Sequence, residues 1–184
     1  ASGDRRWNDV IDKTYAIEQS LFATYSPTTG LLPDFVVKSG SGYAPAGPGF
    51  LEDENDGDYN WNSSRTPWRI GTDYVMTGAE QPKAQLAAMN SWIKQATGGD
   101  PSKIAQGYTL AGEALDPDTD EAFSAPFAVS AMLDSSNQQW LDALWEANTQ
   151  NPVTSYFGDS VRLLSLIVVS GNWWSPTGVG APSA

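Results

Sequence analysis

Five carboxylates crowd the stretch of this sequence that is best suited to acid–base chemistry. They are Glu52, Asp53, Glu54, Asp56 and Asp58. Like charges this close raise one another's pKa values, so one carboxylate in such a group can be tuned for proton transfer. A solvated acidic loop and a calcium-binding loop are the alternatives. The calcium alternative fits less well, because Gly57 stands where the helix-loop-helix pattern needs a ligand.

The residue types that are missing narrow the chemistry further. The sequence contains no histidine and no cysteine, which excludes Ser-His-Asp catalysis, thiol nucleophiles and zinc sites built from histidine or thiolate ligands. Acid–base chemistry must therefore rest on carboxylates, Lys or Tyr, and we predict no cofactor and no metal. The net charge of -12 disfavours nucleic acid and anionic lipid as partners. No segment approaches the roughly 18 consecutive apolar residues of a membrane span.

Aromatic and basic residues follow the carboxylates closely. Tyr59 and Trp61 flank them on a predicted loop, where an aromatic ring can stack on a sugar or pack in the core, and the sequence leaves both open. Arg65, Arg69 and Asp73 are spaced by four, so a helix would place them on one face. This spacing allows Arg69 to pair with Asp73. A surface ion pair is the alternative, but the apolar neighbours indicate partial burial, where a guanidinium can orient carboxylates or sugar hydroxyls.

Helices must position these residues. Apolar residues recur with helical spacing, between Gly, Pro, Asn and Asp punctuation, over 7–24, 66–78, 82–96, 121–134, 137–148 and 157–170. The segment 31–37 is predicted to be an extended connection, and 38–62 a long loop of the kind that is usually functional or disordered. VRLLSLIVVS is apolar almost all round, which predicts a helix buried on every side, whereas LDALWEAN is one-sided. This alternation suggests an inner and an outer layer of helices. The length of 184 residues indicates that 1–184 is a single domain or part of a larger one.

Several motifs, in order along the chain, resemble the carboxy-terminal half of the family 8 glycoside hydrolases. They are GLLPDFVV, NSSRTPWRIGTDY, AFSAPFAVSAM, WLDALWE and YFGDSVRLLSLIVVSGNWW. The resemblance implies an all-α fold that is half of an (α/α)6 barrel, completed by a missing or separate amino-terminal segment. It also implies an inverting endo-hydrolase of β-1,4-linked glucan, mixed-linkage glucan, chitosan or xylan.

One position departs from the commonest pattern of that family. In a large subgroup the general base is an Asp three residues before the arginine of the RTPWRI-like motif, and here that position is Asn62. A second subgroup carries Asn there and takes a Glu from a long upstream loop, and the FLE at 50–52 is similar to that pattern. The resemblance therefore implies Glu52 as the general base, with Glu54 as the fallback. The predicted substrate-binding residues are Tyr59, Trp61, Asn62, Arg65, Arg69 and Asp73.

The same resemblance implies a partner. An inverting glycosidase needs a second carboxyl, roughly 6.5 to 9.5 Å from the base, to protonate the leaving oxygen. In this family it is a Glu near the start of the catalytic domain, so we expect the amino-terminal half of the same enzyme to supply the acid. The expected substrate is a polysaccharide, with chitosan slightly favoured by the negative charge, and the expected location is secreted. The alternative from another class is a non-catalytic carbohydrate-binding or scaffold module derived from half a barrel.

Overall fold

The computed structural model of the chain describes residues 4–150, 152 and 155–174. Its α-helices are α1 (Arg6–Tyr25), α2 (Thr66–Thr77), α3 (Lys83–Ala96), α4 (Glu121–Ala131), α5 (Gln138–Gln150) and α6 (Tyr156–Val169). Each corresponds to one predicted helix, and the largest difference is at the end of α4, which stops three residues before the predicted end at 134. Short 3-10 helices η1 (Ser63–Arg65), η2 (Pro101–Lys103) and η3 (Ser135–Asn137) precede or connect them. The predicted all-α class is confirmed.

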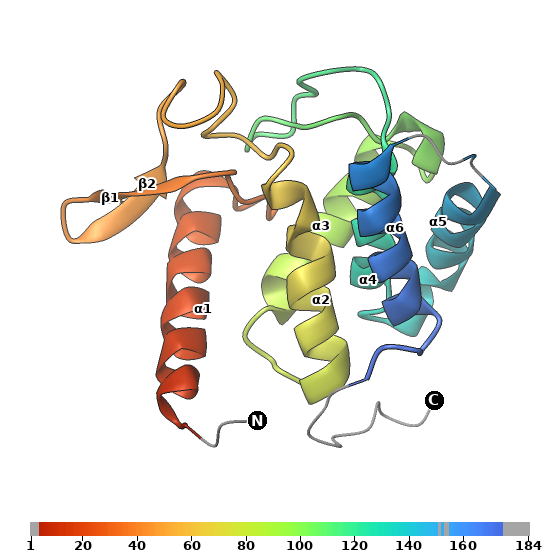
Figure 1. Cartoon of the computed structure of the whole chain (residues 1–184), viewed down its shortest axis with the longest axis horizontal. Coiled ribbons are helices and arrows are strands. Elements are labelled where there is room, and N and C mark those ends of the chain that lie inside the picture. The colour runs from red at the N-terminus through yellow and green to blue at the C-terminus, as the bar shows by residue number, and fades with distance from the viewer. Residues whose placement is uncertain (1–3, 151, 153–154, 175–184) are drawn as a thin grey trace.

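Local signals in the sequence explain where several helices begin and end. Asp120 caps α4 by accepting a hydrogen bond from the Ala122 N–H, and Ser155 caps α6 by accepting one from the Gly158 N–H. At the end of α2, Gly78 adopts the left-handed conformation with a φ of 70°. These caps fix the first turns of α4 and α6 at the same end of the molecule as the start of α2 (Figure 1).

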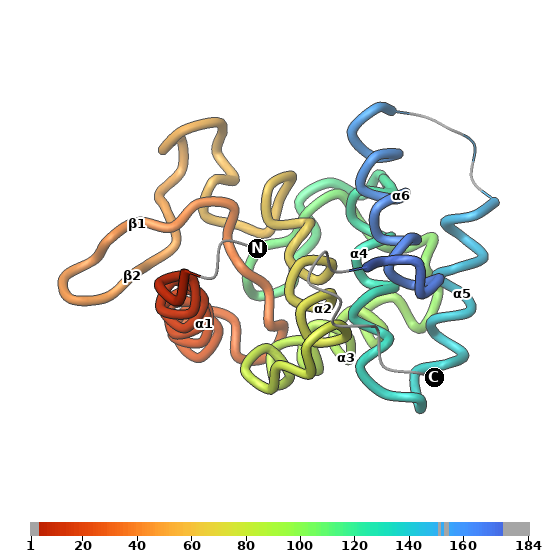
Figure 2. The backbone as a smooth tube through the Cα atoms, turned by 60° about the horizontal axis from the view of Figure 1, so that its bottom comes forward, coloured from red at the N-terminus to blue at the C-terminus, as the bar shows by residue number. Residues whose placement is uncertain are grey.

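A β-hairpin interrupts the helical chain, which the sequence did not predict. Strands β1 (Val36–Ser39) and β2 (Gly42–Pro45) pair antiparallel, with Val36 opposite Pro45. The turn between them contains Gly40 at a φ of 57°, a conformation that tight hairpin turns require. The strands are four residues each, so their alternation was too short to recognise. The hairpin lies beside the carboxy-terminal end of α1 (Figures 1 and 2).

Helix α4 forms the centre of the core. All of its residues except Ser124 are buried, and it packs against α2, α3, α5 and α6. Its side chains are small apart from Phe123 and Phe127, whose burial stabilises the fold by about 1.5 to 3 kcal/mol each. On α2, Gly71 allows close approach, because a Cβ there would lie 2.9 Å from Cγ1 of Val129. The predicted layering is present as α2, α4 and α6 in a row, backed by α3 and α5 (Figures 1 and 2).

The outer helices differ from one another in burial. Helix α5 is one-sided as predicted, with Trp140, Leu144 and Asn148 on its buried face. The prediction that the last helix is buried on every side is wrong for the described residues, because Leu163 of α6 is 60% exposed. Only one side of α6 packs on α4, and no described segment covers the opposite side.

Polar side chains lie between α1 and α2. The Tyr15 hydroxyl donates a hydrogen bond to the Asp73 carboxylate. The Glu18 side chain is half-buried beside them, and its buried Oε2 has no hydrogen-bond partner among the described residues. Burial, and then the negative charge of Asp73, raise the pKa of Glu18 from its ordinary 4.5 to about 7. Charging Glu18 therefore opposes the α1–α2 contact.

We predict that Glu18→Gln weakens the dependence of stability on pH. A raised folded-state pKa means that the contribution of Glu18 to stability is complete below about 4.5 and is lost as the pH rises through about 7. The unsubstituted protein should lose stability over this window, whereas glutamine stays neutral throughout. Thermal unfolding on both sides of the window measures the difference, with Asp12→Asn, an exposed change on the same helix, as control. Parallel pH profiles for the protein and Glu18→Gln would contradict the prediction.

Candidate active site

The carboxylate of Asp34 organises the turn that leads into α2. Its Oδ1 accepts hydrogen bonds from the Asn60 N–H at 2.9 Å and from the N–H and hydroxyl of Ser63 at 2.7 and 2.6 Å. Its Oδ2 accepts from the backbone N–H and the side-chain Nδ2 of Asn62 at 3.0 and 3.2 Å. Five donors on one carboxylate hold the turn in a single arrangement. Sequence reasoning missed Asp34, although an acid directly after the apolar LLP is a usable signal.

Glu52 reaches this turn from the acidic loop. Its Oε2 accepts a hydrogen bond from Nδ2 of Asn62 at 2.8 Å. The side-chain oxygen of Asn62 accepts one from Nη2 of Arg65 at 3.1 Å, and Nε of Arg65 donates to the Asn62 carbonyl at 3.0 Å. Because the amide nitrogen faces two carboxylates and the amide oxygen faces a guanidinium, only one orientation of Asn62 satisfies every partner. The structure thus joins three predicted site residues in one hydrogen-bonded chain.

Asp56 holds the backbone on which Glu52 stands. It is 2% exposed, and its carboxylate accepts the N–H groups of three consecutive residues, Leu51 at 2.6 Å, Glu52 at 3.2 Å and Asp53 at 3.1 Å. Burial raises the pKa of Asp56, but the backbone N–H donors together outweigh it, so the pKa lies below its ordinary value. The buried side chain is therefore a carboxylate anion enclosed by amides.

The other carboxylates of the acidic segment are placed differently. Asp53 is exposed and accepts the Asn55 N–H at 2.7 Å. Glu54 is exposed, and within the part of the chain that the structure describes its side chain forms no hydrogen bond or ion pair. Burial raises the pKa of Asp58, with a further rise from the charge of Asp34. Of the five, Glu52 alone is joined by a side-chain hydrogen bond to the Asn62 turn in the described structure.

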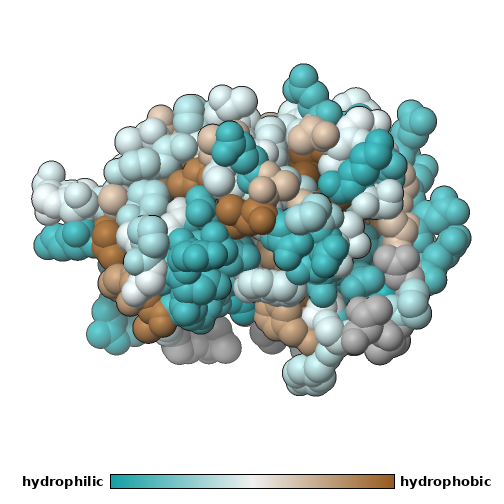
Figure 3. All heavy atoms as spheres, turned by 90° about the horizontal axis from the view of Figure 1, so that it is seen from above, coloured by the Kyte–Doolittle hydropathy of each residue, from teal (hydrophilic) through white to brown (hydrophobic). Residues whose placement is uncertain are grey.

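Trp61 lies at the edge of this group. It is 36% exposed, and its ring meets those of Phe123 at 4.9 Å and Phe157 at 5.9 Å between centroids, both edge to face. The Arg65 guanidinium lies over the Phe157 ring at 5.8 Å. An apolar, partly exposed surface therefore borders the Glu52–Asn62–Arg65 chain. Seen from above the loops, this end of the molecule is mostly hydrophilic with apolar patches between (Figure 3).

Tyr59 does not line this surface, so the prediction that it contacts the substrate is wrong. It is fully buried, at 0% exposed, and its hydroxyl donates to the Ser64 carbonyl at 3.2 Å. Its backbone exchanges two hydrogen bonds with Tyr108, of 2.9 and 2.8 Å, which turns the side chain into the core against Phe123 and Phe127. Packing, which the sequence left as the alternative, is the role that the fold gives it.

Arg69 and Asp73 do not form the ion pair that their spacing allows. The Arg69 guanidinium lies over the Trp68 ring at 4.1 Å, and its pKa is lowered by burial and by the charge of Arg65. Asp73 instead accepts the Tyr15 hydroxyl. Both residues line a pocket of about 250 Å³ between α1 and α2, whereas Asn62 and Arg65 line a separate one of about 380 Å³. Four of the predicted substrate-binding residues are therefore divided between two pockets, and Tyr59 and Trp61 line neither.

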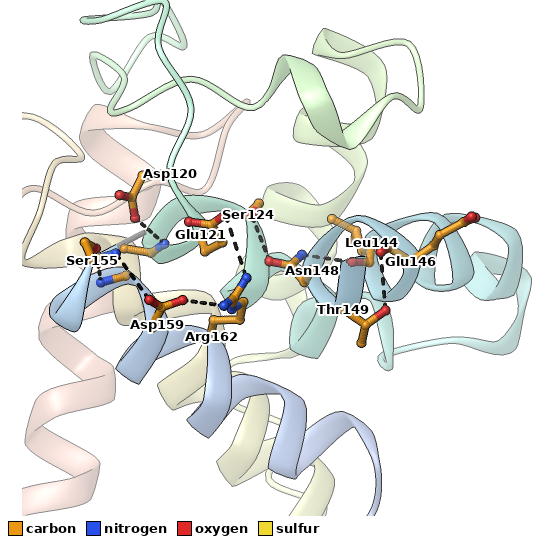
Figure 4. Close-up of polar contacts among 12 residues, drawn as sticks. Asp120, Glu121, Ser124, Leu144, Glu146, Asn148, Thr149, Ser155, Asp159 and Arg162 are labelled. Atoms are coloured by element: carbon orange, nitrogen blue, oxygen red, sulfur yellow. Dashed lines mark hydrogen bonds and ion pairs between the residues drawn. The ribbon is translucent and has the colours of Figure 1, made fainter. Parts of the chain in front are cut away.

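A second polar cluster fixes the amino-terminal end of α6, which carries Phe157. Arg162 points toward Glu121 of α4, at 3.9 Å, and toward Asp159 one turn earlier on its own helix (Figure 4). The Ser124 hydroxyl donates to Oδ1 of Asn148 at 2.9 Å, which links α4 to α5. These largely buried groups hold the three helices in register at the site end.

Two negative findings concern the described residues only. No group of three or more Asp, Glu, His or Cys side chains in 4–150, 152 and 155–174 is arranged to hold a metal ion. None of the helices in those ranges is long and apolar enough to cross a membrane.

Comparison with known proteins relates the chain to polysaccharide-degrading enzymes. No family model matches the sequence. The chain is 53% identical over 175 residues to a β-glucanase of Niallia circulans, covering 95% of this chain and 43% of that protein. The apo structure of a β-1,3-1,4-glucanase from Paenibacillus sp. X4 is also 53% identical, with a TM-score of 0.93, over 94% of this chain and 46% of that one.

A more distant structure extends the likeness of the fold. A GH8 xylanase from Teredinibacter turnerae, in its xylohexaose complex, has a TM-score of 0.63 at 20% identity, over 85% of this chain and 39% of that one. The chain thus spans less than half the length of each of these proteins. Its helices correspond to about half of a family 8 (α/α)6 barrel, as the sequence predicted. The chain is therefore a sequence relative of the β-glucanases that has the fold of glycoside hydrolase family 8.

Proposed function

We propose that this chain is part of an inverting endo-glycanase of family 8 that cleaves β-1,4-linked polysaccharide, and that Glu52 is its general base. The observation that carries the proposal is the hydrogen-bonded chain from Glu52 through Asn62 to Arg65. This hydrogen-bonded chain links the exposed carboxylate of Glu52 to Asn62, and Asn62 stands at the position where a large subgroup of the family has its general base, an Asp. We assign the chain to the subgroup that has Asn there.

The geometry suggests a separate role in hydrolysis for Glu52, Arg65 and Trp61. Oε2 of Glu52 is occupied by Asn62, which leaves Oε1 to take a proton from the attacking water. The water then attacks the anomeric carbon from the face opposite the leaving group, as inversion requires. Arg65 fixes the Asn62 amide, and Trp61 offers an apolar ring face to a sugar.

The general acid is proposed to lie in a further segment of the same enzyme, the amino-terminal half. The short span of the chain relative to its relatives supports this. Exposed apolar side chains on α1 and α6 support it too, since such side chains are usually covered by a partner surface: Trp7, Val10, Ile11 and Leu163. We call this chain together with that segment the complete enzyme.

Mixed-linkage β-glucan is the proposed substrate, because two relatives are named for β-glucan cleavage. The chitosan alternative rests on the net charge of -12 alone. Secretion is proposed because an insoluble polymer cannot enter a cell. Release of reducing sugar from barley β-glucan, and not from chitosan, is expected of the complete enzyme. Release from neither would overturn the enzymatic function.

Glu52→Gln is predicted to lower kcat of the complete enzyme by about 10² to 10⁴-fold while oligosaccharide binding is retained, because an amide cannot accept the proton from water. Steady-state hydrolysis and calorimetric titration measure the two effects. Asp53→Asn, which removes one charge from an exposed neighbour, serves as the control. An active Glu52→Gln together with an inactive Glu54→Gln would transfer the role of base to Glu54.

Asn62→Asp is predicted to lower activity, even though Asp stands at this position in the other subgroup. The substitution removes two N–H donors and places a third carboxylate within hydrogen-bond distance of Asp34 and Glu52. Mutual repulsion should move the acidic limb of the pH profile of kcat/KM to higher pH. Asn62→Ala removes the same donors without adding charge, so its limb should move less than that of Asn62→Asp. Full activity of Asn62→Asp with an unshifted limb would contradict this prediction.

A further inference from the structure

Both oxygens of Asp34 and both oxygens of Asp56 already accept hydrogen bonds. The donors of these bonds include Glu52 itself and residues that contact it or adjoin it in the chain. We propose that Asp56 and Asp34 are positioning residues for Glu52. Asp56 holds its backbone, and Asp34 holds its side chain through Asn62. This inference rests on the proposed function, since it explains how an exposed loop carboxylate is kept in place for proton transfer.

Asp56 acts on the backbone of the loop. Its side chain accepts the N–H groups of residues 51, 52 and 53, so the chain curls around it and carries Glu52 on the outside of the curl. A further hydrogen bond from the Gly49 N–H to the Asp53 carbonyl, at 2.8 Å, closes the same curl. An anion with several acceptor lone pairs can satisfy these convergent donors, whereas an Asn in its place would turn one N–H₂ toward them.

The segments that flank the β1–β2 hairpin fix the position of Asp56. The Phe35 N–H donates to the Asp56 carbonyl at 2.9 Å, and the Asp34 N–H donates to the Asp58 carbonyl at 2.8 Å. The intervening Gly57 passes so close to Ala46, the residue after β2, that a Cβ there would lie 2.3 Å from the Ala46 carbonyl oxygen. The segment that carries Asp56 is therefore fixed to the segment that carries Asp34, and the two carboxylates belong to one frame.

Asp34 acts on the Glu52 side chain. It accepts both N–H groups that Asn62 presents to it, from the backbone and from Nδ2. The second hydrogen of Nδ2 is then left for Oε2 of Glu52, at 2.8 Å. Arg65 blocks the flipped orientation of the amide, because its Nη2 needs the Asn62 oxygen as acceptor. Without Asp34, the turn at 60–63 would lose five hydrogen bonds, and Asn62 would lose the contact that aims it.

Neither carboxylate is placed to be the base itself. Asp56 is buried at 2% exposure among backbone donors, and both oxygens of Asp34 already accept donors from the turn. Glu52 is exposed and has an oxygen to spare. A displacement of about 1 Å in a reacting group can cost about 10²-fold in rate, so loosening either contact should lower turnover without removing the base.

The test uses the complete enzyme with Asp56→Asn and Asp34→Asn, and with Asp53→Asn as the matched control. Asp53→Asn removes the same charge from the same loop, but its carboxylate is exposed and contacts only the Asn55 N–H. We expect kcat to fall by about 10 to 10²-fold for the first two, with KM changed less than about twofold and the acidic limb of the pH profile in place. The control should match the unsubstituted enzyme.

Two further measurements tie the effect to Glu52. In a Glu52→Gln background, Asp56→Asn and Asp34→Asn should lower the residual rate by less than about twofold, because residues that act through Glu52 have nothing left to position. Amide hydrogen exchange at residues 51–53 should become faster in Asp56→Asn, a readout that does not depend on activity.

The outcomes separate the two proposals. An active Glu52→Gln would overturn the proposed base. An inactive Glu52→Gln with Asp56→Asn and Asp34→Asn as active as the control would overturn the positioning role alone. Full loss of activity in Asp34→Asn, with the acidic limb of the pH profile abolished, would also overturn that role and make Asp34 the base.

Discussion

The hydrogen bonds on the Asp34 carboxylate are the constraint on which the site depends. They tie the end of the α1–β1 connection to the turn that begins α2, two parts of the chain about 28 residues apart in sequence. The same turn carries Asn62 and Arg65 and leads directly into η1 and α2. Because the carboxylate is only partly buried and every partner is a donor, its charge is compensated by directed hydrogen bonds instead of an ion pair.

The turn at 60–63 packs against the helical core, which holds it in place. Tyr59 directly precedes it and is buried among aromatic rings, and α4 behind it consists almost entirely of buried residues. Trp61 then extends from the turn to meet Phe123 of α4 and Phe157 of α6. The acidic loop is thus anchored on one side by the segments that flank the hairpin and on the other by the core.

The way in which the acidic loop is anchored gives each of its carboxylates a different environment. The five carboxylates of the acidic segment are close in sequence, yet the fold gives them different surroundings. One is enclosed by amides, one is bonded to an amide side chain, two face solvent and the fifth, Asp58, is half-buried. Proximity in sequence alone would make them equivalent. Their differences come from the number of N–H donors that reach each one, which depends on how the loop curls.

The sequence by itself determined the six helices, the all-α class and the segment that we propose to carry the chemistry. Helical periodicity, caps and Gly or Pro stops act over a few residues, so they can be recognised without knowing the fold. The motifs that resemble family 8 also singled out Glu52 and Asn62, which the structure brings within hydrogen-bond distance.

Only the tertiary structure decided the burial of Tyr59, the separation of Arg69 from Asp73, the exposed side of α6 and the role of Asp34. Each of these depends on partners far away in the chain: Tyr108 for Tyr59, Tyr15 for Asp73 and the turn at 60–63 for Asp34. The hairpin was missed for a related reason, since its strands are four residues each and β2 packs against α1, which lies earlier in the chain. Local patterns specify which elements form, whereas long-range hydrogen bonds and packing decide which side chains face the site.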